Sequence, residues 1–289
     1  MQTIGFYIAY GFLWLITLIP LRILYGLSDF VFVVLFYLIP YRKKLVIKNL
    51  KNSFPEKNDK EIKLIARKFF HHFCDNFLES FALIHMSKKE IRRRFIIQNP
   101  EILDEFLARD QHLIAVSGHQ CTWDWFAGFP FYSQYRLMAL YKPLHNKYYD
   151  VLFKKLREKF GSHTIANTHA VKVMLSYDGP PSIFWFIADQ RPLRKDIRYW
   201  TTFMNQDSPV FMGVEKIAAK TNFPVIYFYM RKVKRGHYSA EIIILCDNPK
   251  AAKPNEVTEL HVRILEQNIK EQPECYLWSH NRWKHKKLN

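Results

Sequence analysis

The chain has 289 residues, 49% of them hydrophobic, and its 43 lysines and arginines against 26 aspartates and glutamates give a net charge of +17. That much apolar material excludes a disordered chain and predicts a folded domain with a sizeable core. The nine glycines form no G-x-G-x-x-G pattern or P-loop, and the four cysteines include no C-x-x-C pair. The sequence therefore gives no support to a Rossmann enzyme, a kinase, a zinc ribbon or a disulfide framework.

The first forty residues are predicted to anchor the protein to a membrane. Residues 4–21 carry no charge, and as a helix they would be roughly 27 Å long, close to the hydrocarbon thickness of a bilayer. Residues 23–41 are also apolar apart from Asp29. Because Pro20 and Gly26 interrupt these stretches, one spanning helix and two short interfacial helices remain alternatives, with a buried core helix as a third.

The charges after the apolar stretches predict how this anchor is oriented. A cleaved signal peptide is not expected, because the N-terminus has no cationic region and no A-x-A site follows. Five basic residues and no acid lie within 42–51, which the positive-inside rule places in the cytoplasm. We therefore expect residues 1–40 to be a membrane-anchoring helical segment and residues 41–289 to be a single domain on the cytoplasmic side.

A long helix is predicted between residues 56 and 86, because apolar side chains recur there every three or four residues. This stripe, either core or membrane-facing, consists of Ile62, Ala66, Phe69, Phe73, Phe77, Phe81 and Ile84. On another face His71, Asp75 and Glu79 lie four residues apart. That spacing permits a metal site, but it is more typical of a polar face with local hydrogen bonds, so no metal is expected.

From residue 100 onward, predicted strands alternate with predicted helices. The apolar runs indicate strands at 112–119, 182–189, 224–231 and 240–245, and helical patterns cover 149–160, 171–177, 214–220 and 256–272. The first two strands are apolar almost throughout, which is typical of strands buried on both faces. The alternation predicts an α/β fold with a mixed, mostly parallel central sheet flanked by helices.

The block from Ser117 to Trp125 begins where the first of these strands ends, and α/β sheets place their functional sites at strand ends. On one continuous helix His119 and Asp124 would lie about 140° apart, so a turn must bring them together. Asp124 would then accept the Nδ1 proton of His119 and leave Nε2 free as a general base. The alternative is that both residues only stabilise the strand end and the helix start. Ser117 lacks a G-x-S-x-G elbow, and Cys121 is a weak nucleophile candidate.

The H-x-x-x-x-D block resembles the signature of glycerolipid-type acyltransferases. Other blocks, in family order, narrow this to a resemblance to the lauroyl/myristoyl acyltransferases of lipid A biosynthesis, within the lysophospholipid-acyltransferase-like superfamily. These blocks are Tyr41-Arg42, Asn49-Leu50, Ser53 to Glu56, Asp75 and Glu79, Gly118-His119, Trp123 to Trp125, Ala188 to Gln190, and the ending Tyr276 to Lys284. They cover nearly the whole chain.

The resemblance implies a membrane-bound O-acyltransferase at the cytoplasmic face of the bacterial inner membrane. It would transfer a fatty acyl chain from acyl carrier protein, or from acyl-CoA, to a hydroxyl of a Kdo-bearing lipid A precursor. His119 would be the general base, oriented by Asp124. The resemblance gives substrate-binding roles to Asp189, Gln190, Arg191 and Arg282, and it implies neither a metal nor a cofactor.

Basic clusters at 88–94, 154–159, 231–235 and 282–287 indicate acidic partners. An anionic membrane surface, a phosphorylated acceptor and acyl carrier protein all fit. Nucleic acid is not expected, because the chain has no recognisable nucleic-acid-binding motif. Two other hypotheses remain open: O-acylation of another membrane lipid, such as an amino-acid-containing lipid or a lysophospholipid, and a non-enzymatic basic protein that binds membranes peripherally.

Overall fold

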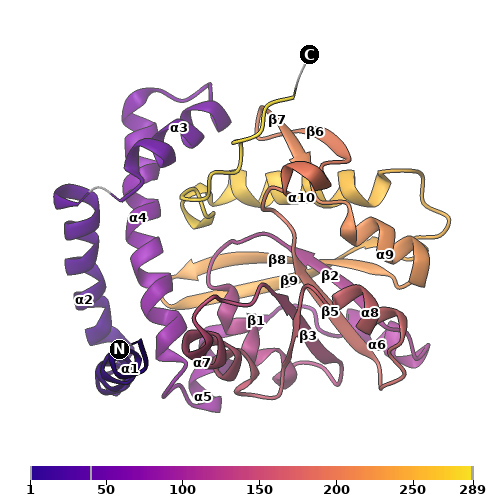
Figure 1. The fold of residues 1–289 in the computed structure, drawn as a ribbon, viewed down its shortest axis with the longest axis horizontal. Helices are drawn as coiled ribbons and strands as arrows, with labels where there is room; N and C mark the ends of the chain where they lie inside the picture. Colours follow the sequence, from indigo (N-terminus) through magenta and orange to yellow (C-terminus); the bar gives the residue numbers. More distant parts are fainter. Residues whose placement is uncertain (1, 40, 288–289) are drawn as a thin grey trace.

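A seven-stranded sheet forms the centre of the protein, whose computed structural model describes residues 2–39 and 41–287 (Figure 1). The strands are β1 (Phe95–Ile97), β2 (Leu113–Ser117), β3 (Arg136–Tyr141), β4 (His163–Ala166), β5 (Ser182–Ile187), β8 (Val225–Lys234) and β9 (His237–Cys246). Their spatial order is β1-β9-β8-β2-β5-β3-β4, and neighbours run parallel except for the antiparallel pair β8 and β9. The predicted mixed, mostly parallel α/β sheet is confirmed.

Strand β2 lies at the middle of this sheet and is buried along its whole length. Its side chains alternate between two hydrophobic cores, with Ile114 and Val116 in one and Leu113 and Ala115 in the other. The continuous apolar run arises because both faces of the strand are covered. Each large side chain buried in this way contributes about 1.5–3 kcal/mol.

Helices cover both faces of the sheet (Figure 1). On one face the core includes residues of α8 (Ala170–Leu175), α9 (Gly213–Thr221) and α10 (Glu256–Glu271). On the other it includes residues of α5 (Lys88–Arg94), α6 (Ile102–Ala108), the 3₁₀ helix η2 (Trp123–Phe131) and α7 (Lys147–Glu158). The helices predicted near 149–160, 171–177, 214–220 and 256–272 are thus confirmed, with small differences at their ends.

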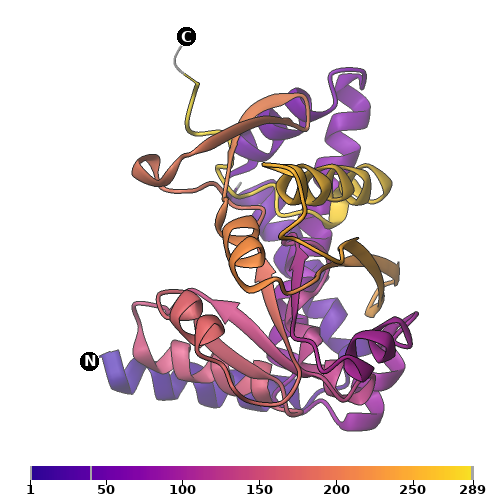
Figure 2. The ribbon, with the colours of Figure 1, turned by 90° about the vertical axis from the view of Figure 1, so that its right-hand side faces the viewer.

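Several short elements have no counterpart in the sequence prediction. They include β1, β3, β4, α5, α6 and the hairpin of β6 (Tyr199–Phe203) and β7 (Gln206–Val210). Most contain only three to seven residues, too few for a hydrophobic period to be recognised. The hairpin lies beside the C-terminal segment, at the end of the molecule opposite α1 (Figures 1 and 2).

The predicted long helix is α4 (Asp59–Ala82), preceded by α3 (Lys43–Ser53). It begins at a capping box, in which Asn58 accepts from backbone N–H groups and the Glu61 side chain accepts from the Asn58 backbone. Its apolar stripe packs into the core at Ile62 and Phe69, but Phe77 is 58% exposed. The stripe is therefore exposed at Phe77, which lines a cavity described below, and is buried again at Phe81 in the second core.

The apolar N-terminus forms two helices, α1 (Gln2–Thr17) and α2 (Leu21–Val33), and a π-helical turn extends α2 to Leu38. Pro20 separates the two helices, whereas Gly26 lies inside α2 without breaking it. Residues 21–38 are long and apolar enough to cross a membrane by length and composition, with 33% of them buried, and α1 is shorter. Residue 40, where the predicted anchor ends, lies outside the described residues, so this domain boundary stays a prediction.

Candidate active site

A cavity of about 850 Å³ opens beyond the carboxyl ends of β2, β3 and β5. The segments after these strands contribute His119, Lys142 and Gln190 to its wall. Phe73 and Phe77 of α4 line it as well. The cavity therefore lies at the carboxyl edge of the parallel strands, as predicted for a site in an α/β sheet.

The C-terminal segment holds the loop that carries His119. The backbone N–H of Leu277 donates to the His119 carbonyl at 3.1 Å, and the Cys121 N–H donates to the Cys275 carbonyl at 3.0 Å. Between these contacts Gln120 and Tyr276 form an antiparallel bridge. Segments more than 150 residues apart in sequence are thus joined by backbone hydrogen bonds at the site, which short-range sequence patterns cannot reveal.

Within the cavity the imidazole of His119 is paired with Asp189. The His119 Nδ1 lies 2.6 Å from Asp189 Oδ1, and the side chains are 18% and 3% exposed. Because a carboxylate at Nδ1 favours the tautomer that carries its proton there, Nε2 is left with a free lone pair. The amide nitrogen of Gln190 approaches this Nε2 at 3.4 Å. The arrangement suits an imidazole that accepts a proton at Nε2.

The environment of Asp189 keeps it ionised despite its burial. Burial by itself raises the pKa of this carboxyl, but the charge and hydrogen bond of His119, together with backbone N–H donors, lower the pKa overall. A carboxylate held in this way can stabilise an imidazolium that forms beside it during a reaction.

Asp124 lines the same cavity but has other partners. Its carboxylate accepts from Ser80 Oγ at 2.7 Å and from Arg157 Nε at 2.9 Å. The predicted hydrogen bond between Asp124 and His119 is therefore wrong, because Nδ1 is bonded to Asp189. The cause is the intervening turn, where Cys121 adopts a left-handed φ of 54° and a 3₁₀ helix then directs Asp124 toward α4 and α7. Whether Asp124 acts in catalysis stays a prediction.

The remaining predicted site residues divide between the cavity wall and the interior. Gln190 and Arg191 line the cavity, and Arg191 Nε donates to the Asn281 carbonyl at 3.0 Å. Arg282 is only 3% exposed and is not part of the cavity wall. Its Nε and Nη1 have no hydrogen-bond partner within the described residues. Burial lowers the pKa of this guanidinium, and the nearby Asp189 carboxylate opposes the effect.

Two of the polar residues noted on α4, His71 and Asp75, belong to a separate network around Arg235. Its guanidinium contacts Asp29 at 2.6 Å and Asp75 at 2.7 Å, while His71 Nε2 lies 2.8 Å from Asp29. Asp29, His71 and Asp75 place potential metal ligands within 4.8 Å of one another. Because Arg235 already supplies the positive charge between the carboxylates, the geometry fits an ion-pair network better than a metal site.

The chain matches the model of a known protein family over nearly its whole length. The model of the bacterial lipid A biosynthesis acyltransferase family matches residues 1–285. The chain belongs to this family. It is also 21% identical over 284 residues to a lipid A biosynthesis lauroyltransferase of Escherichia coli (strain K12), covering 96% of this chain and 90% of that protein. The resemblance inferred from the sequence blocks is confirmed, and the protein is an acyltransferase of lipid A biosynthesis.

Sequence reasoning missed some residues of this acyltransferase that shape the site. Ser80 of α4, a partner of Asp124, has no role in the sequence analysis, and Arg157 of α7, the other partner, appears there only as part of the basic cluster 154–159. Neither belongs to a block that carries the family resemblance. Asp189, to which the resemblance gives a substrate-binding role, is paired with His119, and its contact with substrate stays a prediction. The signal available in the sequence was the position of Asp189, just after a buried strand adjacent to β2.

Proposed function

We propose that the acyltransferase transfers a fatty acyl chain from acyl carrier protein, or from acyl-CoA, to a hydroxyl of a Kdo-bearing lipid A precursor, with His119 as general base. The observation that carries this proposal is the imidazole of His119, held at Nδ1 by buried Asp189 in the wall of a large cavity. The family membership supports the reaction class and the lipid A-type acceptor.

The proposed chemistry is direct attack of the acceptor alcohol on the donor thioester. As the new C–O bond forms, Nε2 of His119 takes the hydroxyl proton. As the C–S bond breaks, that proton passes to the departing thiolate. Such general base catalysis typically contributes about 10²–10⁴-fold, because an alcohol is a poor nucleophile at neutral pH. Asp189 stabilises the transient imidazolium and fixes the ring, and no covalent enzyme intermediate is required.

The lining of the cavity supports binding of a hydrocarbon chain. Phe73, Phe77, Phe126 and Trp185 present aromatic side chains to it, together with aliphatic residues of β3 such as Leu137. Removing each methylene of an acyl chain from water contributes about 0.8 kcal/mol. The acyl chain would occupy this apolar part while the thioester lies beside His119.

The N-terminal helices support attachment to the cytoplasmic face of the inner membrane. Large apolar side chains on α1 and α2 are exposed, including Ile8 at 69%, Phe12 at 63% and Phe30 at 65%. The basic residues of 42–51 follow directly. An apolar surface of this kind next to cations suits a bilayer that carries anionic lipids.

The test is acyl transfer by the purified full-length protein, with acyl carrier protein or CoA thioesters as donors and a Kdo-bearing lipid A precursor as acceptor. His119→Ala and His119→Gln should abolish turnover while circular dichroism shows that both variants remain folded. Substantial activity in both folded variants would contradict the assigned base.

A second measurement tests the acceptor. Mass spectrometry of lipids from deletion and wild-type cells should show lipid A that differs by one acyl chain. Unchanged lipid A, together with the loss of an acyl chain from another lipid, would show that the enzyme acylates that other membrane lipid by the same chemistry.

A further inference from the structure

A second cavity, of about 660 Å³, lies between the β6 region and the C-terminal segment. Lys284 to Lys287 form one side of it, and Arg194, Ile197 and Trp200 form the other. The wall thus combines several cations with two apolar side chains. The sequence predicts an acidic partner for the basic cluster 282–287 without identifying it, and the chemistry at His119 uses none of these residues.

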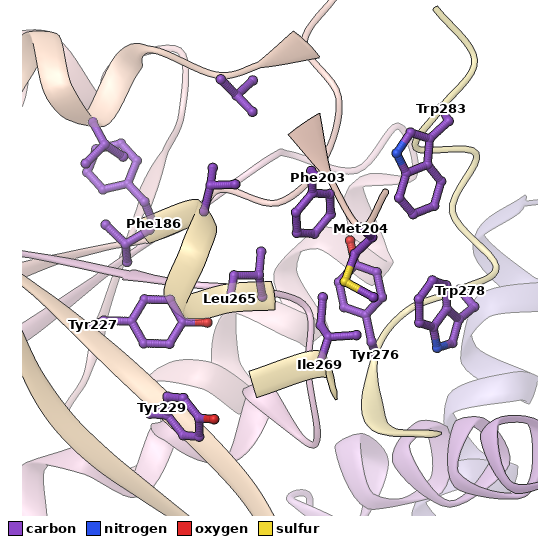
Figure 3. Packing of buried hydrophobic residues seen from close by; sticks show 14 of the residues in the cluster. Phe186, Phe203, Met204, Tyr227, Tyr229, Leu265, Ile269, Tyr276, Trp278 and Trp283 are labelled. Carbon is purple, nitrogen blue, oxygen red and sulfur yellow. The ribbon is translucent and has the colours of Figure 1, made fainter. Parts of the chain in front are cut away.

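The C-terminal side of this basic cavity is fixed by Trp283. The indole of Trp283 is buried and donates from Nε1 to Ser208 Oγ of β7 at 2.8 Å. Its ring stacks on Phe203 of β6, with centroids 6.1 Å apart and planes at 19°, and the two rings lie side by side in Figure 3. Because this anchor immediately precedes Lys284, the cavity has a defined wall rather than a loose tail.

The positive charge of this region is not neutralised by the protein. Within the described residues, Arg191, Arg194, Lys284, Lys286 and Lys287 make no ion pair with a carboxylate. Arg194 and the three lysines of the wall are exposed and have no carboxylate partner among the described residues, so they can pair with an anionic ligand that enters the cavity.

Arg191 connects the basic cavity to the catalytic one. It lines the wall of the catalytic cavity, and its Nη1 lies 3.0 Å from Nε2 of His285, which lines the basic cavity. The two spaces therefore adjoin through one pair of side chains. A ligand that offers a hydroxyl to His119 can extend its polar part past Arg191 into the basic cavity.

We propose that the basic cavity binds the anionic saccharide head of the acceptor lipid, with phosphate or carboxylate groups on Lys284, Lys286 and Arg194 and a sugar ring against Trp200. This inference rests on the proposed function and names the part of the acceptor that is bound. Ammonium and guanidinium groups form their strongest hydrogen bonds with such anions. Ile197 and Trp200 supply the apolar surface against which the C–H face of a sugar packs.

The experiment measures equilibrium binding of a Kdo-bearing lipid A precursor to the full-length protein in neutral detergent without acyl donor. The variants are Lys284→Ala/Lys286→Ala and Trp200→Ala, and the matched control is Lys250→Ala/Lys253→Ala, which removes two exposed lysines elsewhere. Each cavity variant should weaken binding about tenfold, the loss expected for one or two charge-assisted contacts or a packed ring, and the control should not. In turnover assays the acceptor KM should rise while the donor KM and kcat stay unchanged.

Two further ligands identify the anion: the same precursor without its phosphates, and one without Kdo. The Lys284→Ala/Lys286→Ala effect should disappear with the ligand that lacks the recognised group. An effect that persists with both ligands, an equal effect of the control, or a rise in the KM for acyl carrier protein in place of the acceptor would overturn the inference. Failure of the unaltered protein to bind or acylate the precursor would reject the proposed function itself, and with it this inference.

Discussion

Two groups of buried polar side chains in this protein differ in whether their charged members are paired. Between α2, α4 and the β8–β9 hairpin, the Glu79 carboxylate accepts from the hydroxyls of Tyr25 and Tyr238, and Asp75 is bonded to Ser28 and Arg235. Around His119 the pairing is incomplete. Arg282 Nε and Nη1 and His280 Nε2 have no partner within the described residues.

The difference separates charged side chains that hold the fold together from a buried cation that the protein leaves unpaired. In the first group the charged side chains have hydrogen-bond partners within the protein and require no ligand. These bonds join α2 to α4 and so explain their packing. Arg282 and His280 line neither cavity, so their unpaired atoms show incomplete pairing in the C-terminal segment and not a ligand contact. Both groups contain blocks of the family resemblance, so the sequence alone does not distinguish the two roles.

The largest expected effect is on catalysis and comes from Asp189→Asn. Because the amide cannot carry the charge that stabilises an imidazolium on His119, kcat should fall about 10²–10⁴-fold with little change in acceptor KM. The measurement is steady-state kinetics on protein of unchanged thermal stability. Asp124→Asn is the comparison. Its kcat should fall less, because Asp124 is bonded to Ser80 and Arg157 and not to His119. A greater loss in Asp124→Asn would return the orienting role to Asp124.

Breaking the paired network should mainly reduce stability. Arg235→Met leaves the fully buried Asp75 carboxylate without its cation, and the expected loss is about 3–5 kcal/mol in the free energy of unfolding. Denaturant titration in detergent measures it. The control is Arg231→Met, whose partners Glu241 and Glu271 are at least 38% exposed, and it should cost about 1 kcal/mol or less. Equal losses would show that the Arg235 network contributes no more than a surface pair.

A smaller loss of folding stability is expected at acidic pH. Burial lowers the pKa of His261 from 6.5 to about 4, so below pH 6.5 the unfolded chain binds a proton that the folded protein does not. Stability should therefore fall by about 1.4 kcal/mol per pH unit between pH 6.5 and about 4, or about 2 kcal/mol at pH 5. His280, whose pKa burial also lowers to about 4, adds to this slope. Denaturant unfolding at several pH values measures this dependence. In His261→Gln the free energy of unfolding should fall less steeply as the pH is lowered, and an unchanged dependence on pH would show that other groups cause the acid sensitivity.

The smallest effect should come from Tyr25→Phe, which removes one hydrogen bond between α2 and Glu79. The Glu79 carboxyl keeps Tyr238, so the expected loss is about 1 kcal/mol. Limited proteolysis of the N-terminal helices, together with denaturant titration, measures it. Tyr37→Phe, at a residue that is 57% exposed, is the control. A loss of several kcal/mol would mean that the Tyr25 hydroxyl alone holds α2 in place.

The sequence itself was sufficient for much of the fold. Strands β2 and β5 were predictable because burial on both faces requires apolar residues at every position, and α4 because its stripe repeats over many turns. The short strands β1, β3 and β4 carry too few residues for such a period. Pro20 correctly indicated a break between helices, whereas Gly26 did not, because one glycine costs a helix only about 1 kcal/mol.

At the site the sequence determined the chemical groups, and the tertiary structure determined their pairing. His119, Asp124 and Asp189 were all identifiable, since they follow buried strands and lie in blocks that carry the family resemblance. Which carboxylate binds Nδ1 depends on a left-handed turn at Cys121 and on the parallel alignment of β2 with β5, which brings Asp189 to His119. Hydrogen bonds between residues 70 positions apart are set by packing, and a linear pattern carries no record of them.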